Sequence, residues 1–176
     1  MFNNTKQRIA AALRLLMNER PFEKITVQNL MDATHMKRQS FYYHFQDTRD
    51  VLMWICRQEL LDPLEQSELP FTEWVVLAMT LLDQDRSFYR RLLNVAYLDF
   101  VLEFENRILR PKMVRLLFPS AEAQPLDDNQ RFAVDFMCQA VSSRLCQFVH
   151  TRAPLNPETV RDHWEYLLNR LHIHIP

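Results

Sequence analysis

The sequence predicts an all-α protein of about nine helices, because three observations favour helices over strands. The 176 residues include no glycine, the residue on which tight β-hairpin turns most often depend. Apolar residues recur every three or four positions along most of the chain, which is the spacing of one helix face. Prolines, nine in all, divide most of the chain into segments of helical length.

Three short helices are expected at the start of the chain. The first covers residues 5–18, where apolar side chains share one face. The second covers residues 26–33, and Thr26 suits its N-cap because a hydroxyl can accept a hydrogen bond from a free backbone N–H. The third covers residues 37–43, after a turn of three or four residues.

The rest of the chain is also expected to be helical. A fourth helix begins at Asp47, with Asp50 placed as in a capping box, and runs toward Leu61. Pro111 is expected to kink or break the helix that contains it, and residues 120–128 form a polar loop. The remaining helices are expected over residues 72–85, 87–95, 98–118, 129–150 and 157–172.

Composition excludes several classes of function. Phosphate-binding loops, dinucleotide-binding turns and nucleophile elbows require glycine where the backbone approaches a ligand or turns sharply. Cys56, Cys138 and Cys146 lack the spacing of metal ligands, and their odd number favours a reducing cytoplasm. No stretch approaches the roughly 20 apolar residues of a membrane helix. Since no catalytic spacing stands out either, we expect a cytoplasmic protein without metal, cofactor or membrane contact, and not an enzyme.

Residues 26–45 carry the most informative pattern. Two short helices joined by a tight turn, the second beginning with basic and amide side chains, are typical of a helix-turn-helix. In the second helix Met36, Phe41 and Phe45 can point inward, which leaves the polar side chains outward. Such a helix fits the major groove of DNA. The alternative is that residues 26–45 form a pair of surface helices in an ordinary helical bundle, without a role in DNA binding.

The outward side chains suit DNA chemically. Lysine and arginine can bond guanine, and glutamine can pair with adenine, whereas hydroxyls and helix N-termini suit phosphate oxygens. His44 could equally close the C-terminus of its helix. The distribution of charge also favours DNA contact by the N-terminal part. Residues 1–50 carry eight Lys/Arg and five Asp/Glu, whereas residues 51–176 carry thirteen Lys/Arg and seventeen Asp/Glu.

The same region resembles the TetR family of bacterial transcriptional regulators. The resemblance lies in Ile25-Thr26-Val27-x-x-Leu30-Met31-x-Ala33, in Phe41-Tyr42-Tyr43-His44-Phe45 and in the acidic helix start that follows. Three positions depart from the family: His35 stands where glycine is usual, Gln39 where a small residue is frequent, and Thr48 where lysine is common. By resemblance, the DNA contacts are Thr26, Lys37, Arg38, Gln39, Ser40, Tyr42, Tyr43, His44 and Thr48.

The resemblance implies a DNA-binding domain over residues 1–48 and an effector-binding and dimerisation domain over residues 49–176. It further implies a homodimer, joined through the last two helices, on a near-palindromic double-stranded operator. A small-molecule effector would lie among aromatic side chains, although aromatics at helical spacing are more often core. The expected pocket residues are Phe88, Tyr97, Phe100, Phe104 and Phe136.

Residues 38–47 and the short body are similar to a subgroup resembling the dihydroxyacetone kinase activator. In that subgroup the body docks a partner protein instead of a small ligand, so the identity of the effector stays open between these two classes. A third alternative is a helical scaffold or enzyme that does not bind DNA. Residues 172–174 place two histidines near the end of the chain without a further ligand, which favours surface imidazoles over a metal site.

Overall fold

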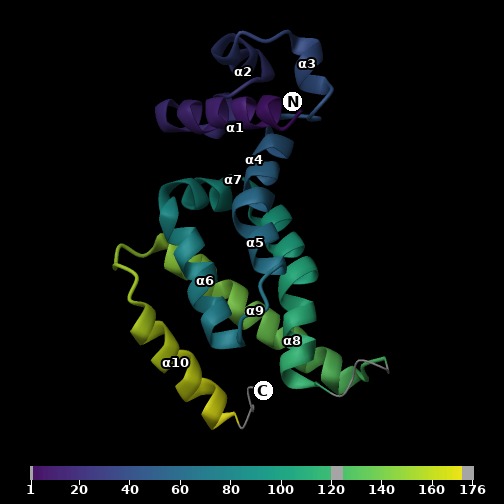
Figure 1. Cartoon of the computed structure of the whole chain (residues 1–176), viewed down its shortest axis with the longest axis vertical. Helices are drawn as coiled ribbons and strands as arrows, with labels where there is room; N and C mark the ends of the chain where they lie inside the picture. Colours follow the sequence, from purple (N-terminus) through teal and green to yellow (C-terminus); the bar gives the residue numbers. More distant parts are fainter. Residues whose placement is uncertain (1, 120–124, 172–176) are drawn as a thin grey trace.

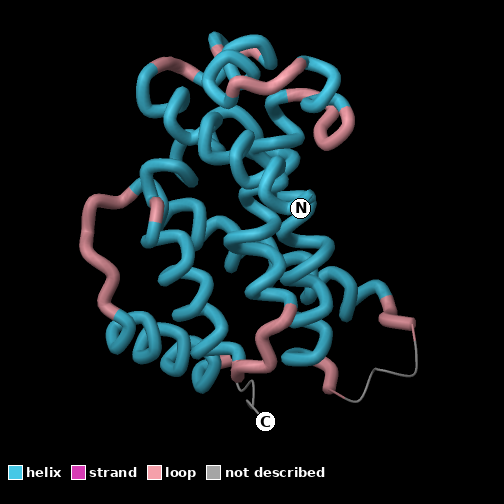
Figure 2. Tube along the Cα trace, turned by 45° about the horizontal axis from the view of Figure 1, so that its top comes forward, coloured by secondary structure: helices cyan, strands magenta, loops and turns pink. Residues whose placement is uncertain are grey.

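The computed structural model describes residues 2–119 and 125–171, and this part of the chain consists of helices and loops without strands (Figures 1 and 2). The expectation of an all-α fold is confirmed, with eight continuous helical rods instead of about nine. The helices are α1 (Phe2–Glu19), α2 (Val27–Thr34), α3 (Arg38–Tyr42), α4 (Thr48–Cys56), α5 (Asp62–Glu65), α6 (Phe71–Gln84), α7 (Arg86–Phe104), α8 (Arg110–Leu117), α9 (Asp128–His150) and α10 (Pro157–Arg170).

The molecule has a head and a body, which we define as α1–α3 and α4–α10 respectively. Figure 1 shows α4 leading from the head into the body, where α5 continues its line. Helices α6 and α7 pack against this central rod, α9 packs against α6, α7 and α8, and α10 lies along the outside against α6. The polar loop expected before α9 falls partly outside the described residues.

Prolines do not break the two rods that contain them, α4–α5 and α7–α8. Pro111 was expected to kink or break its helix, yet α7 continues into α8 through a π-helical turn, Glu105–Leu109. A second π-helical turn, Arg57–Leu61, joins α4 to α5 just before Pro63. The wider turn gives room to a proline ring, which in an α-helix would clash with the carbonyl four residues earlier.

Helix α7 is distorted at another place. Ala96 has φ −139° and ψ 34°, which are not helical angles. This position coincides with the boundary expected between residues 87–95 and 98–118. In Figure 1 the first part of α7 crosses the molecule just below α1, whereas the continuation toward α8 descends along the body.

One apolar core runs from the head into the body. Leu13 and Phe41 are fully buried in the head, and the same cluster extends to Trp74 in the body. The Trp74 indole stacks on Phe104, with 6.4 Å between ring centres, and its N–H donates to the carbonyl of Leu64 at 3.0 Å. The buried N–H is therefore satisfied, as a buried polar group requires.

Helix α10 is attached mainly through α6. Trp164 meets Phe71 edge to face at 5.4 Å, and the Arg161 guanidinium binds both carboxylate oxygens of Glu73. On the side of α9 the contact is looser, because a groove of about 300 Å³ separates the two helices. A single buried residue of α10, Leu168, enters the core.

The turn between α2 and α3 is closed by a histidine in place of glycine. His35 is left-handed, with φ 56° and ψ 36°. Its N–H donates to the carbonyl of Asp32 at 3.4 Å, and the N–H of Met36 donates to that of Met31 at 3.1 Å. These two bonds form a Schellman motif, which usually has glycine at the left-handed position.

Replacing this histidine should therefore stabilise the head. We expect His35→Gly to raise the free energy of unfolding by about 0.5–1 kcal/mol, because glycine adopts left-handed angles without a Cβ clash. The matched control is Ala33→Gly in the last turn of α2, which should lower stability by about 0.5–1 kcal/mol. Urea unfolding measures both. A loss of stability in both variants would contradict the assignment of strain to His35.

Candidate nucleic-acid interface

Two buried phenylalanines fix the orientation of α3. Phe41 is fully buried and Phe45 is 3% exposed, and their rings lie 5.9 Å apart. Phe45 also meets the indole of Trp54 edge to face at 6.0 Å, which ties the end of α3 to α4. Because one side of α3 is held in the core, its other side must face solvent.

The solvent-facing side carries the side chains for which DNA contact was predicted. Lys37, Arg38 and Gln39 are exposed at the start of the helix. Tyr42 and Tyr43 are exposed by 50% and 73% further along. Ser40 and His44 are half-buried at the margins, and the His44 ring lies edge to face with Tyr43 at 4.9 Å. The predicted contacts on α3 are therefore gathered on one accessible surface.

This surface has positive charge that is not neutralised locally. Within the described part of the chain, no carboxylate forms an ion pair with Lys37 or Arg38. The Arg38 guanidinium instead donates to the Tyr42 hydroxyl at 3.1 Å and lies 5.6 Å from the centre of that ring. The tyrosine thus restricts the arginine while leaving its charge available for an anion.

Along the chain, α3 stands between two helices whose N-termini are capped, α2 and α4. The Thr26 hydroxyl accepts from the N–H of Asn29 at 3.2 Å, and the Asn29 side chain accepts from the N–H of Thr26 at 3.0 Å, a reciprocal capping box. Asp47 caps α4 by accepting from the N–H of Asp50 at 2.8 Å. Thr48, the predicted phosphate contact, is the first residue of α4 and is half-buried.

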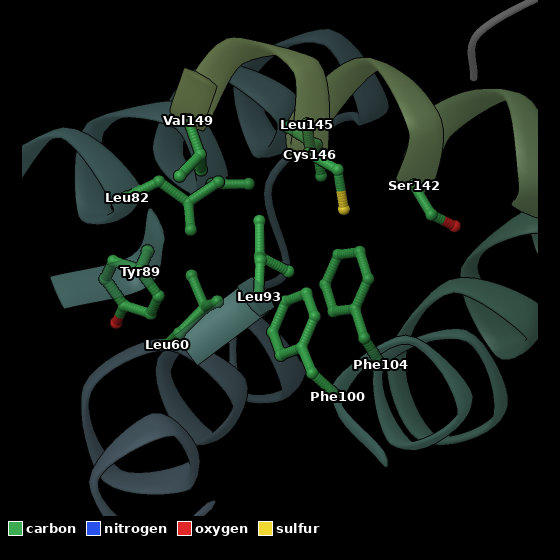
Figure 3. A pocket seen from close by; sticks show the side chains of 11 residues that line it. Leu60, Leu82, Tyr89, Leu93, Phe100, Phe104, Ser142, Leu145, Cys146 and Val149 are labelled. Atoms are coloured by element: carbon green, nitrogen blue, oxygen red, sulfur yellow. The ribbon is translucent and has the colours of Figure 1, made fainter. Parts of the chain in front are cut away.

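The body contains a small apolar cavity between α7 and α9 (Figure 3). Its volume is about 10 Å³, which is room for roughly one water molecule. Phe100 and Phe104 line it, and Figure 3 shows both rings turned toward Leu93. The other lining residues are Leu60, Ala78, Leu82, Tyr89, Ser142, Leu145, Cys146 and Val149.

The structure separates the five aromatic residues that were expected to form an effector pocket. Only Phe100 and Phe104 line the cavity. Phe88 is buried elsewhere, beneath the Arg14 guanidinium at 4.1 Å from its ring centre, where the head meets the body. Tyr97 and Phe136 are exposed by 52% and 61%. The aliphatic lining residues had no distinguishing signal, because their spacing is that of any helical core.

The cavity carries no charge that could fix a polar ligand. Burial raises the pKa of the Cys146 thiol to about 11, so at neutral pH it stays protonated and is a poor nucleophile. The Ser142 hydroxyl is engaged, since it donates to the carbonyl of Cys138 at 2.6 Å. These groups favour apolar contents.

Two further expectations concern metals and membranes. Among the described residues, no group of three His, Cys, Asp or Glu side chains could hold a metal ion, while His172 and His174 lie outside them. No described helix is both long and apolar enough to span a bilayer.

Comparison with known proteins agrees with this geometry. Residues 9–53 match the family described as bacterial regulatory proteins, tetR family. The chain is 26% identical over 109 residues to the HTH-type dhaKLM operon transcriptional activator DhaS of Lactococcus lactis subsp. lactis (strain IL1403). That alignment spans 58% of this chain and 57% of the activator. Both the family and this relative are transcriptional regulators and not enzymes.

Solved structures extend the similarity to the fold of the whole chain. A dihydroxyacetone kinase operon activator DhaS has a TM-score of 0.63 at 19% identity, covering 95% of each chain. A TetR transcriptional regulator from Streptococcus agalactiae 2603V has a TM-score of 0.65 at 21% identity, covering 94% of each. The head of this chain, residues 9–53, therefore matches the TetR family, and the whole chain resembles the DhaS activators in its fold.

Proposed function

We propose that this chain is a transcriptional regulator that binds operator DNA as a homodimer and responds to an effector at its body. The observation that supports this proposal most directly is the solvent-facing surface of α3, where Lys37, Arg38 and Gln39 are exposed on a helix that the packed core holds in place. Recovery of genomic DNA bound to the full chain tests the proposal. Enrichment of one or a few promoters supports it, and no enrichment favours a helical scaffold that does not bind DNA.

The proposed contacts divide into base reading and positioning. Lys37 and Arg38 would bond guanine and Gln39 adenine, since these pairings fit the edges of bases in the major groove. Hydroxyls and helix N-termini on either side would bind phosphates, which fixes the register without reading sequence. The positioning contacts are Thr26, Ser40, Tyr42, Tyr43, His44 and Thr48.

Exposed apolar side chains on the last two helices support a homodimer. Phe132 and Phe136 of α9 are exposed by 71% and 61% and stack on each other at 6.3 Å. Tyr166 and Leu171 are exposed on or next to α10. Such a surface favours an interface, here a four-helix bundle between two copies. Two heads on one dimer would read half-sites roughly 34–36 Å apart, or a multiple of that distance.

Two classes of effector remain candidates for the body. A small apolar ligand would have to push apart the side chains around a cavity of about 10 Å³. A partner protein on the surface needs no such opening, and the similarity to DhaS activators makes it the natural second candidate. Either effector would act by binding one arrangement of the heads better than the other.

Removing a base-reading cation should weaken operator binding. We expect Lys37→Ala or Arg38→Ala to cost about 1–3 kcal/mol each where the side chain makes a bidentate base contact. Fluorescence anisotropy with the recovered operator at fixed salt measures this. Arg152→Ala, an exposed cation of the body, is the control and should bind as the wild type does. Unchanged binding in both α3 variants would remove α3 as the reading helix.

Tyr42 is expected to position and not to read. Its hydroxyl would bind a phosphate, so Tyr42→Phe should weaken binding to all DNA sequences by a similar factor. Competition between operator variants measures the preference, with Tyr97→Phe, at an exposed tyrosine of α7, as the control. A changed base preference would show that Tyr42 acts on the bases, directly or through its bond to Arg38.

The dimer proposal makes a prediction about mass. Sedimentation at micromolar concentration should give a dimer, and Phe136→Glu should shift it to the monomer because a charge would be buried at the interface. Leu98→Glu places the same change on an exposed apolar residue of α7 and should leave the dimer intact. A monomeric wild type would contradict the model of two half-sites.

A further inference from the structure

The distorted part of α7 lies between the cavity and the head. Leu93 and Phe100, which stand on either side of Ala96, both line the cavity. A break of this kind disturbs the regular bonding of nearby carbonyls, which then need other donors. The carbonyl of Val95, next to the break, accepts a hydrogen bond from outside the helix.

The donor is Arg49, the second residue of α4. One guanidinium nitrogen, Nη2, donates to the Val95 carbonyl at 3.0 Å, and Nη1 donates to Oδ2 of Asp99 at 3.1 Å. The two acceptors stand on opposite sides of Ala96 in the sequence. Arg49 therefore holds both parts of the distorted segment at once, and its charge is directed to the body.

The same residue belongs to the helix start that completes the head. Its neighbour Thr48 begins α4 and is a proposed phosphate contact. Directly before it, Asp47 caps α4 and the N–H of Gln46 donates to Asp50 at 3.1 Å. The chain from the end of α3 to the first turn of α4 is thus closely bonded, so fixing Arg49 also fixes the end of the reading helix.

A second ion pair joins the same two helices further from the head. Arg57 donates from Nε and Nη2 to both carboxylate oxygens of Glu103, at 2.7 and 3.0 Å. Glu103 lies one helical turn beyond Asp99 on α7. Arg57 also lies 3.8 Å from Asp50. This lower pair ties α4 to α7 without touching the distorted segment, which makes Glu103 a matched control.

We infer that Arg49 is a positioning residue, which sets the orientation of the head on the body by holding the distorted segment of α7. The inference rests on the proposed function, because the orientation matters only if the head binds DNA. A head held in one orientation loses less freedom when it binds than a head that can rock. The segment that Arg49 holds also lines the cavity, so a change in the body's packing at Leu93 or Phe100 would reach the head through this contact.

The test compares Arg49→Met, Asp99→Ala and the double variant on the operator recovered with the wild type. We expect each single change to weaken binding by roughly 3- to 30-fold, the usual range for residues that couple two sites. The double variant should bind no more weakly than Arg49→Met, because Arg49→Met already removes the contact with Asp99. Glu103→Ala should bind within about twofold of the wild type, a margin below the effects usual for coupling residues.

Charge and stability provide the discriminating readouts. Removing an acid near DNA favours binding electrostatically, so a loss of affinity in Asp99→Ala has the opposite sign to a charge effect. Its salt dependence should equal that of the wild type, since no phosphate contact is lost. The pair is about half exposed, so the unfolding temperature should shift by no more than about 2 °C.

Three results would overturn the inference. The first is an Asp99→Ala variant that binds the operator as tightly as the wild type does. The second is a double variant whose loss of affinity equals the sum of the two single losses. The third is a salt slope that falls by about one in Arg49→Met and keeps its wild-type value in Asp99→Ala, which would make Arg49 a direct phosphate contact. A wild-type chain that binds no DNA would overturn the proposed function itself, and so is distinguishable from these.

Discussion

The fold depends on how the helix ends are closed, and without glycine the C-terminal ends lack the residue that most often closes them. Each N-terminus leaves free backbone N–H groups that need acceptors. Side-chain oxygens supply them at α2, α4, α7, α9 and α10, which keeps the helix starts fixed although the connecting segments are short. The capping residues are Thr26, Asp47, Asp85, Asp127 and Asn156. Among the described residues one has left-handed backbone angles, and it is a histidine, His35, at the end of α2.

These closures determine what α3 can present to DNA. The Schellman bonds at His35 set the angle between α2 and α3, and Phe41 then fixes the rotation of α3 about its own axis. Because the angle between the helices and the rotation of α3 are both fixed, Lys37 and Arg38 can change direction only through rotation of their own side chains. The position of the proposed contacts thus follows from backbone hydrogen bonds and one buried ring.

The positions of the helices could be predicted from the sequence in the head and in the body, but the surroundings of the body's side chains could not. Local signals decide the head: Thr26 before an apolar run and the alternation of Phe41 and Phe45 with polar residues each act over a single helix. The body depends on packing between distant segments, which spacing does not encode. Pro111 illustrates this, since a π-helical turn absorbs its ring. The exposure of Tyr97, although it is aromatic and at helical spacing, illustrates it again.

Helix α7 joins the parts of the molecule that a regulator has to connect. Near its start, Arg90 donates to the carbonyl of Val149 at the end of α9, the helix that carries the exposed phenylalanines, and Arg86 donates to two carbonyls in the segment that follows α9. At its middle it lines the cavity, and there the carbonyl of Val95 meets α4. Since a cavity of about 10 Å³ leaves little slack, a close-packed core transmits a shift of one part of α7 to its neighbours. On the proposed function, an effector that moved α7 would therefore act on the surface proposed for dimerisation and on the head together.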